Sequence, residues 1–329
     1  MTAVGPTGHS LGRSVVRGRF APSPTGPLHF GSLIAALGSF LDARHQDGEW
    51  WVRIEDLDPP RVVPGAALHI LHTLEAHGLC WDGAVVYQSQ RCAHYQAALE
   101  QLQQRGLAYP CTCSRKDLGR IARPGPAGFV YPGLCRNGVR HPGRPVAIRL
   151  RTDDGYLGFH DAIQGDYGQY LEREIGDFVI RRADGLFAYQ LAVVIDDAAQ
   201  GITQIVRGSD LLDSTPRQIL LQRLLDLPTP AYAHLPVAVD RRGCKLSKQT
   251  RAPPLDSRRS GPTLVAALQF LGQAPPLDLA LEPPAVILDW ACTHWQRTQV
   301  PKILTRTWSF PIVSIATWDG LTKNNKAID

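Results

Sequence analysis

One stretch decides the fold: residues 15–55, which read VVRGRFAPSPTGPLHFGSLIAALGSFLDARHQDGEWWVRIE. The short apolar run over 15–21 predicts a buried strand, and the Pro- and Gly-rich residues after it predict a turn. From His29 to about His45 apolar residues recur at helical spacing, and residues 49–55 predict the next strand. Strand, turn, helix and strand in this order are typical of a βαβ unit. We therefore expect an α/β fold with a parallel sheet.

The same reasoning extends along the chain. Apolar periodicity predicts further helices over 68–77, 93–105, 188–199 and 215–227, strands over 146–150, 178–182, 205–208 and 237–239, and weakly helical patches within 263–296. Residues 111–145 are instead rich in Gly, Pro, Arg and Cys and carry few large apolar side chains. This composition indicates an insert without a core of its own.

The overall composition is that of an ordinary globular protein. Of 329 residues, 44% are hydrophobic, 20% are charged and seven are Trp, which excludes a disordered or fibrous chain. No apolar stretch approaches the roughly 20 residues that a membrane span needs. The net charge of +5 permits a nucleic-acid partner without requiring one. Seven cysteines without disulfide-like spacing, and no apolar leader, predict reduced thiols, a cytoplasmic location and no membrane contact.

The turn that leads into the first helix is a candidate phosphate site, because helix N-termini at this edge of a sheet bind anions. Residues 26–32 have the spacing of a P-loop, but no Lys precedes Ser32, and two prolines remove N–H donors. Phosphate must therefore be bound differently from a P-loop. His29 lies in the first turn of the helix, and Gly31 allows a ligand to approach the backbone. The alternative is that His29 is an ordinary buried histidine.

A second candidate is the basic stretch KLSKQ at residues 245–249. Its two lysines, Lys245 and Lys248, are three residues apart on a loop and can hold a polyphosphate from one side. Alone, such a stretch is usually a solvated charged segment.

The two motifs together indicate one protein family far more specifically than either motif does alone. Arg19–Ser32 is similar to the first signature of the class I aminoacyl-tRNA synthetases, in the form of the glutamyl enzymes, and residues 245–249 resemble the second. Ser32 stands where the general pattern has its last His, Leu246 stands for Met, and Gln249 for Ser. The resemblance covers about residues 17–295. It implies a Rossmann-type (HUP) parallel sheet with an inserted acceptor-like subdomain that contains zinc, and a short helical C-terminal segment.

On this basis the chain divides into six parts: a flexible leader (1–14), the first half of the catalytic domain (15–108), the inserted subdomain (109–175), the second half of the catalytic domain with the KLSKQ loop (176–250), a linker with a short helical segment (251–301) and a tail to which we assign no role (302–329).

The resemblance also implies roles for individual residues. The expected glutamate pocket consists of Arg19, Phe20, Ala21, Pro22, Ser23, Glu55, Tyr189 and Arg207. Within it Arg19 faces the side-chain carboxylate and Glu55 receives the α-ammonium group. The expected ATP-binding residues are His29, Gly31, Ser32 and Lys248, and the expected catalytic residues are His29, Lys245 and Lys248, acting with Mg²⁺. Asp196 and Asp197 are candidate bases only by their closeness to Tyr189 in the chain, and surface acids are the favoured interpretation.

Three cysteines of the insert have the spacing of a metal site: Cys111-x-Cys113, then Cys135. Structural Zn²⁺ would give this Gly- and Pro-rich segment the cohesion that it lacks. By chemistry alone the fourth ligand is His141 or Cys92, whereas the resemblance points to Tyr131. The alternative is a set of free thiols.

The chain after Lys248 is too short for the helical anticodon-binding region of ordinary glutamyl-tRNA synthetases. The resemblance therefore narrows to a truncated branch of that family. Its members activate L-glutamate with ATP without tRNA and transfer it to queuosine in the anticodon stem-loop of tRNA(Asp). We expect this function, in a monomer. The alternatives are a minimal synthetase that charges a tRNA 3′ end, a non-catalytic tRNA-binding paralogue, and a nucleotidyltransferase that makes adenylates for another acceptor.

Overall fold

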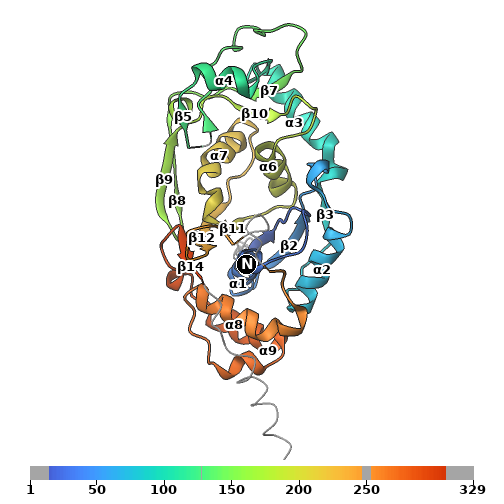
Figure 1. The fold of residues 1–329 in the computed structure, drawn as a ribbon, viewed down its shortest axis with the longest axis vertical. Coiled ribbons are helices and arrows are strands. Elements are labelled where there is room, and N and C mark those ends of the chain that lie inside the picture. The colour runs from blue at the N-terminus through green and yellow to red at the C-terminus, as the bar shows by residue number, and fades with distance from the viewer. Residues whose placement is uncertain (1–14, 127, 247–252, 309–329) are drawn as a thin grey trace, which may run out of the picture.

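The structure, a computed structural model, describes residues 15–126, 128–246 and 253–308. Its amino-terminal part contains, in order, β1 (Arg17–Phe20), α1 (Phe30–Arg44), β2 (Glu49–Ile54), α2 (Ala66–Ala76) and β3 (Val86–Tyr87). β1 and β2 pair in parallel, with Arg19 opposite Trp51, and β3 pairs in parallel with β2. α1 packs on β1 and β2 and buries Leu33, Leu37 and Leu41 completely. The predicted βαβ unit is therefore confirmed (Figure 1).

The second half of the main sheet follows the insert. Two of its strands are β11 (Gln204–Gly208) and β12 (Ala231–Leu235), with α6 (Tyr189–Ala199) before them and α7 (Thr215–Leu224) between them; β13 (Val237–Val239) follows and belongs to a separate small sheet. β11 and β12 pair in parallel. The N–H of Thr203, just before β11, donates to the carbonyl oxygen of Arg17 at 3.0 Å. β1 and β11 therefore lie side by side with their carboxyl ends at one edge of the sheet, where open α/β sheets bind ligands.

The insert lies at one end of the elongated molecule (Figure 1). With the segments that flank it, it contains α3 (Cys92–Gln104), β4 (Ala108–Cys111), α4 (Arg115–Ile121), β5 (Pro124–Gly125), β6 (Gly128–Phe129), β7 (Ala147–Leu150), α5 (Leu171–Glu174) and β10 (Phe178–Arg181). β4, β7 and β10 form an antiparallel sheet. Tyr109, Cys111, Leu118, Tyr131 and Cys135 are buried together. The expectation that the insert lacks a core was wrong, because a small core surrounds two of its cysteines.

A hairpin that sequence patterning did not predict joins the insert to the main sheet. Its strands are β8 (Tyr156–Asp161) and β9 (Gly165–Tyr170), which pair antiparallel. Exposed positions alternate with buried or half-buried ones along β8, but both strands contain glycine and β9 has no aliphatic side chain, so no apolar period marks the pair as a whole. Asp161, the last residue of β8, lies opposite Tyr232 of β12. This register places a fully buried carboxylate beside β12.

The carboxy-terminal part packs back on the amino-terminal half. It contains α8 (Ser260–Phe270), which packs on α1, then α9 (Pro284–His294) and β14 (Thr305–Thr307). β14 pairs in parallel with β13. The part of the tail from 302 to 308, for which the sequence predicts no element, thus contributes a strand, held by backbone pairing rather than by an apolar period. Among the described residues no helix is both long and apolar enough to cross a membrane.

Candidate functional site

A cleft of about 470 Å³ opens at the carboxyl ends of β1 and β11. The predicted residues that line it are Arg19, Phe20, Ala21, Pro22, Ser23, His29, Gly31, Ser32, Tyr189, Arg207 and Lys245. The structure thus brings together residues from four separate segments of the sequence. Lys248, with its neighbours in 247–252, lies outside the described residues. Glu55 does not line the cleft, although its N–H donates to the carbonyl oxygen of Pro22, which does.

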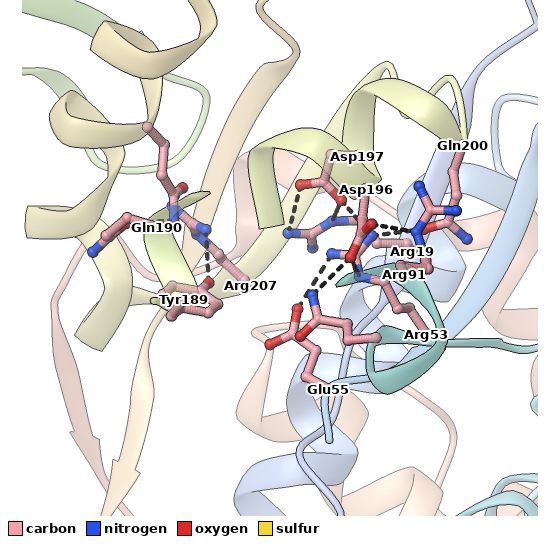
Figure 2. Close-up of polar contacts among 12 residues, drawn as sticks. Arg19, Arg53, Glu55, Arg91, Tyr189, Gln190, Asp196, Asp197, Gln200 and Arg207 are labelled. Atoms are coloured by element: carbon pink, nitrogen blue, oxygen red, sulfur yellow. Dashed lines mark hydrogen bonds and ion pairs between the residues drawn. The ribbon is translucent and has the colours of Figure 1, made fainter. Parts of the chain in front are cut away.

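Arg207 is a buried guanidinium whose hydrogen-bond acceptors are all uncharged. Its Nε donates to Nε2 of His234 at 3.1 Å, and Nη1 donates to the hydroxyl of Tyr189 at 3.3 Å. Nη2 donates to Oγ1 of Thr215 and Oε1 of Gln218, at 2.9 and 2.8 Å. No carboxylate of the described chain lies within 4 Å of it. One N–H of Nη1 and the hydroxyl hydrogen of Tyr189 can therefore donate to a ligand in the cleft (Figure 2).

Arg19 has a different environment, because it is ion-paired. Its Nε lies 3.1 Å from Oδ1 of Asp197, and both side chains are buried. The same carboxylate accepts from Nη1 of Arg53 at 2.8 Å. Burial alone would raise the pKa of Asp197, but the charges and hydrogen bonds of Arg19 and Arg53 outweigh it and hold that pKa below its usual range. Arg19 thus presents to the cleft a guanidinium that a protein carboxylate already anchors.

The aspartates of α6 belong to a buried ionic network, which corrects the surface position favoured for them above. Asp196 is fully buried and accepts hydrogen bonds from Arg91, Tyr95 and Gln88. With Asp197 it forms the acidic centre that Figure 2 shows among three arginines. These contacts occupy both carboxylates with partners inside the protein, so neither is a suitable base for the reaction.

Glu55 sits beside this network. Its Oε1 accepts a hydrogen bond from Nη2 of Arg53 at 3.3 Å. Burial raises the pKa of Glu55, although the charges of Arg53 and Arg19 oppose the shift. Because burial disfavours the charged form of this carboxyl, a bound ammonium group would stabilise the carboxylate further and lower its pKa.

The two signature stretches touch each other at Gly31. A Cβ added at Gly31 would lie 2.9 Å from the carbonyl oxygen of Leu246, so only glycine allows this approach. His29 precedes the first residue of α1, and its Nε2 lies 3.2 Å from Oγ of Ser32. Nζ of Lys245 reaches the same cleft and lies 2.7 Å from Oδ2 of Asp210. A helix N-terminus and a lysine thus face one space, which suits a polyphosphate.

The insert holds a compact group of sulfur atoms. The Sγ atoms of Cys111, Cys113 and Cys135 all lie within 4.8 Å of one another. The hydroxyl of Tyr131 lies 3.3 Å from Sγ of Cys111 and 3.8 Å from Sγ of Cys113, and accepts from the N–H of Cys135 at 2.9 Å. In the described part of the chain this group includes no histidine or acidic side chain. His141 and Cys92, the candidates from chemistry alone, lie outside this group, whereas the hydroxyl of Tyr131 lies within it.

Arg149 packs against the group formed by the three cysteines and Tyr131. Its guanidinium carbon lies 3.8 Å from the centre of the Tyr131 ring, and its Nε donates to Sγ of Cys111 at 3.2 Å. Burial would raise the pKa of Cys135, but hydrogen bonds from the backbone at Thr112 and Arg140 lower it to about 6. Backbone donors thus favour a thiolate at Cys135, whereas burial and the neighbouring sulfur atoms raise the pKa of Cys113 to about 12.

Sequence reasoning missed the polar residues that hold the pocket from behind: Arg53, Asp161, Thr215, Gln218 and His234. Two of them carried a signal. Arg53 interrupts the apolar strand WWVRI, and His234 interrupts AYAHLPVAV. A polar side chain at a buried strand position needs a partner, and such residues often support a site. Their partners lie far away in the sequence and could not be named without the fold.

Comparison with known proteins identifies the family to which the chain is similar. Residues 15–257 match the model of the catalytic domain of class I tRNA synthetases (E and Q). The chain is 57% identical over 284 residues to a glutamyl-Q tRNA(Asp) synthetase of Thiobacillus denitrificans, covering 86% of this chain and 94% of that protein. It is likewise 57% identical over 290 residues to one of Neisseria meningitidis serogroup A, covering 87% of this chain and 97% of the relative.

Solved structures show the same fold. A glutamate tRNA ligase from Elizabethkingia meningosepticum, in complex with its amino acid, superposes with a TM-score of 0.74 at 27% identity, covering 90% of this chain and 67% of that one. The glutamate-tRNA synthetase of Elizabethkingia anophelis superposes with a TM-score of 0.75 at 25% identity, covering 96% and 76%. The chain therefore belongs to the class I tRNA synthetases for glutamate and glutamine, in the family of the glutamyl-Q tRNA(Asp) synthetases.

Proposed function

We propose that the chain is a ligase that activates L-glutamate with ATP, without tRNA, and transfers the glutamyl group to queuosine in the anticodon stem-loop of tRNA(Asp). The observation that carries this proposal is the cleft, which joins Arg207 and Tyr189 to the first signature and to Lys245. The relatives at 55–57% identity, which carry the name glutamyl-Q tRNA(Asp) synthetase, support the choice of acceptor.

In this proposal the pocket selects glutamate by charge. The Nη1 of Arg207 and the hydroxyl of Tyr189 receive the side-chain carboxylate, and Arg19 adds a second guanidinium, while Glu55 attracts the α-ammonium group. A buried guanidinium without a direct countercharge costs free energy, which a bound carboxylate recovers. Glutamine brings no charge and leaves that cost uncompensated, so we expect the pocket to reject it.

Activation requires positioning and charge stabilisation rather than a protein nucleophile. The ionised α-carboxylate attacks the α-phosphorus of ATP, the new C–O–P anhydride forms, and the bond to pyrophosphate breaks. His29, Gly31, Ser32 and the N-terminus of α1 hold the triphosphate, while Lys245 and Lys248 neutralise the leaving group. Mg²⁺ would supply further charge on the phosphates. In the second step a queuosine hydroxyl attacks the activated carbonyl, and AMP leaves.

The insert supplies a basic surface for the tRNA. Between residues 112 and 146 its exposed cations are Arg115, Lys116, Arg120, Arg123, Arg140 and Arg144. Between residues 112 and 146 the sole acidic residue is Asp117, which pairs with Arg144. Exposed lysines and arginines concentrated in one segment favour phosphate backbones through charge and counterion release. We therefore assign the stem-loop contact to this face of the monomer.

The cysteine group fits a structural Zn²⁺. A purely apolar cluster would have no use for a tyrosine hydroxyl buried among three sulfur atoms, whereas a tetrahedral ion needs four donors. Cys111, Cys113, Tyr131 and Cys135 would hold the ion and thereby stabilise the insert that presents the basic face.

The first test is glutamate-dependent exchange of labelled pyrophosphate into ATP in the absence of tRNA. Exchange with glutamate, and none with glutamine, is the expected result. A non-catalytic paralogue gives no exchange under any condition. A synthetase that charges a 3′ end, the function of the Elizabethkingia enzymes to which the fold is similar, is the second candidate. Transfer to tRNA(Glu), measured with the same labelled glutamate, would favour it.

A further inference from the structure

A buried chain of hydrogen bonds runs behind Arg207, away from the cleft. Nε of Arg207 donates to Nε2 of His234 at 3.1 Å, and Nδ1 of His234 lies 2.5 Å from Oδ2 of Asp161. Both His234 and Asp161 are fully buried. The three residues come from β11, β12 and β8, so the main sheet and the hairpin together hold the chain in place.

The geometry defines which nitrogen of His234 carries the proton. Arg207 can only donate, so Nε2 of His234 must accept, and the hydrogen resides on Nδ1 and points at Asp161. Oδ1 of Asp161 is held by the N–H groups of Ile163, Gln164 and His234, at 2.9–3.0 Å. Burial lowers the pKa of His234 to about 4, so the imidazole is neutral at physiological pH.

As a consequence, the carboxylate of Asp161 is the nearest countercharge along this chain, and the imidazole ring of His234 separates it from Arg207. A guanidinium buried without any carboxylate would be costly, whereas one paired directly, as Arg19 is with Asp197, has its charge already satisfied. The neutral ring of His234 avoids both extremes. Asp161 compensates the buried charge through the ring, and the Nη1 edge of Arg207 stays available to the cleft.

We propose that His234 and Asp161 are positioning residues for substrate binding: they aim Arg207 and keep its charge available for the substrate carboxylate. This inference rests on the proposed function, because it takes Arg207 to be the carboxylate-binding group. Thr215, Gln218 and Tyr189 also hold the guanidinium. Loss of the hydrogen-bond relay formed by Asp161 and His234 therefore misdirects Arg207 without releasing it.

The most direct test is the variant Asp161→Asn, which changes one atom of the relay and keeps the shape. Its amide oxygen retains the three backbone N–H groups, so its amide nitrogen faces Nδ1 of His234 and donates to it. The hydrogen of His234 must then move to Nε2, where it opposes the donor Nε of Arg207. We expect the Kd and KM for glutamate to rise about 10- to 100-fold. The KM for ATP and the kcat at saturating glutamate should change less than about threefold.

The chain offers a matched control in the same hairpin. His160 and Asp166 form a second His–Asp pair, with Nδ1 and Oδ1 2.7 Å apart, but both side chains are largely exposed. Asp166→Asn should leave the Kd and KM for glutamate unchanged. The ¹⁵N shifts of His234 add a readout that a purely structural role would not move. They should show hydrogen on Nδ1 in the unaltered protein and on Nε2 in Asp161→Asn.

The outcomes separate this inference from the proposed function. If the unaltered protein shows no glutamate-dependent exchange, the proposed function is wrong. If it is active and Asp161→Asn binds glutamate normally, or weakens ATP and glutamate equally, the inference alone is overturned. Should Asp161→Asn not fold, His234→Phe replaces it, with the same loss of glutamate affinity expected. Normal glutamate affinity there overturns the inference as well.

Discussion

Arg19 and Arg207 line one cleft, and the resemblance places both in the glutamate pocket, with Arg19 as the group that faces the side-chain carboxylate, but their surroundings differ. Arg19 lies against the carboxylate of Asp197, whereas Arg207 contacts five uncharged acceptors: His234, Tyr189, Leu211, Thr215 and Gln218. The motif indicates which residues meet. It could not indicate which of the two keeps its charge for a ligand, because the answer depends on partners from α6, α7 and β12.

Replacing Arg207, which has no carboxylate partner, should therefore affect glutamate binding more selectively than replacing Arg19. In Arg207→Gln the direct cationic contact to the substrate carboxylate is lost, and we expect the KM for glutamate to rise about 100-fold or more, with weaker discrimination against glutamine. Exchange kinetics with both amino acids measure this. Arg173→Gln, at a well-exposed site on α5, is the control and should change neither value. An unchanged KM in Arg207→Gln would contradict the pocket assignment.

The supporting residues also show why the site could not be completed from the sequence. Asp161 and His234 are 73 residues apart and meet only because β8 and β12 are neighbours. The strand that ends in Asp161 is interrupted by glycine and pairs with β9, which has no aliphatic side chain, so neither the hairpin nor its partner in the sheet was predicted. The βαβ unit was predicted correctly because α1 buries a helical row of leucines, a purely local pattern.

At the scale of elements, the start of α1 and the loop that begins at Lys245 act as one unit because Gly31 lies against Leu246. In Gly31→Ala the new methyl group would collide with backbone, which cannot move aside cheaply. We expect the KM for ATP to rise about tenfold, with little change in the KM for glutamate. Gly119→Ala on α4 is the matched control, since its Cβ would meet Phe129 at an ordinary 3.5 Å. A normal KM for ATP in Gly31→Ala would show that this contact is dispensable.

The insert gives a second prediction at this scale. If Tyr131 is a zinc ligand, Tyr131→Phe keeps the ring against Arg149 but removes the fourth donor. We expect this variant to lose Zn²⁺ to a chelator at least tenfold faster than the unaltered protein, measured as metal per chain by mass spectrometry. Tyr170→Phe, an exposed tyrosine of β9, should hold its metal normally. Protein purified without any zinc would refute the assignment of the ion itself.

At the scale of the whole molecule, the last described residue, Trp308, packs against the start of α1 beside the cleft. The ring of Trp308 stacks on that of Phe30 at 5.4 Å between ring centres, and the backbone N–H of Trp308 donates to the carbonyl oxygen of Val239 at 2.8 Å. Phe30 follows His29, and β13 leads into the loop that contains Lys245. The segment that the sequence left without a role thus ties together the supports of both signature stretches.

The variant Trp308→Ala tests whether the contacts of Trp308 with Phe30 and Val239 support the site. Losing a large, partly buried ring should cost about 3 kcal/mol of stability, measured by denaturant unfolding, and should also raise the KM for ATP. Trp290→Ala removes another partly buried tryptophan, from α9, and should lower stability without changing the KM for ATP. Equal effects of the two variants on ATP would show that β14 and Trp308 serve stability alone.

The central claim is the transfer of glutamate to queuosine, and the sharpest test uses an acceptor without a 3′ CCA end. The purified chain would be incubated with ATP, labelled glutamate and an anticodon stem-loop of tRNA(Asp), either with queuosine or with guanosine at the wobble position. The account predicts labelling of the queuosine stem-loop alone. No label on that stem-loop, together with labelling of the 3′ end of intact tRNA(Glu), would contradict it.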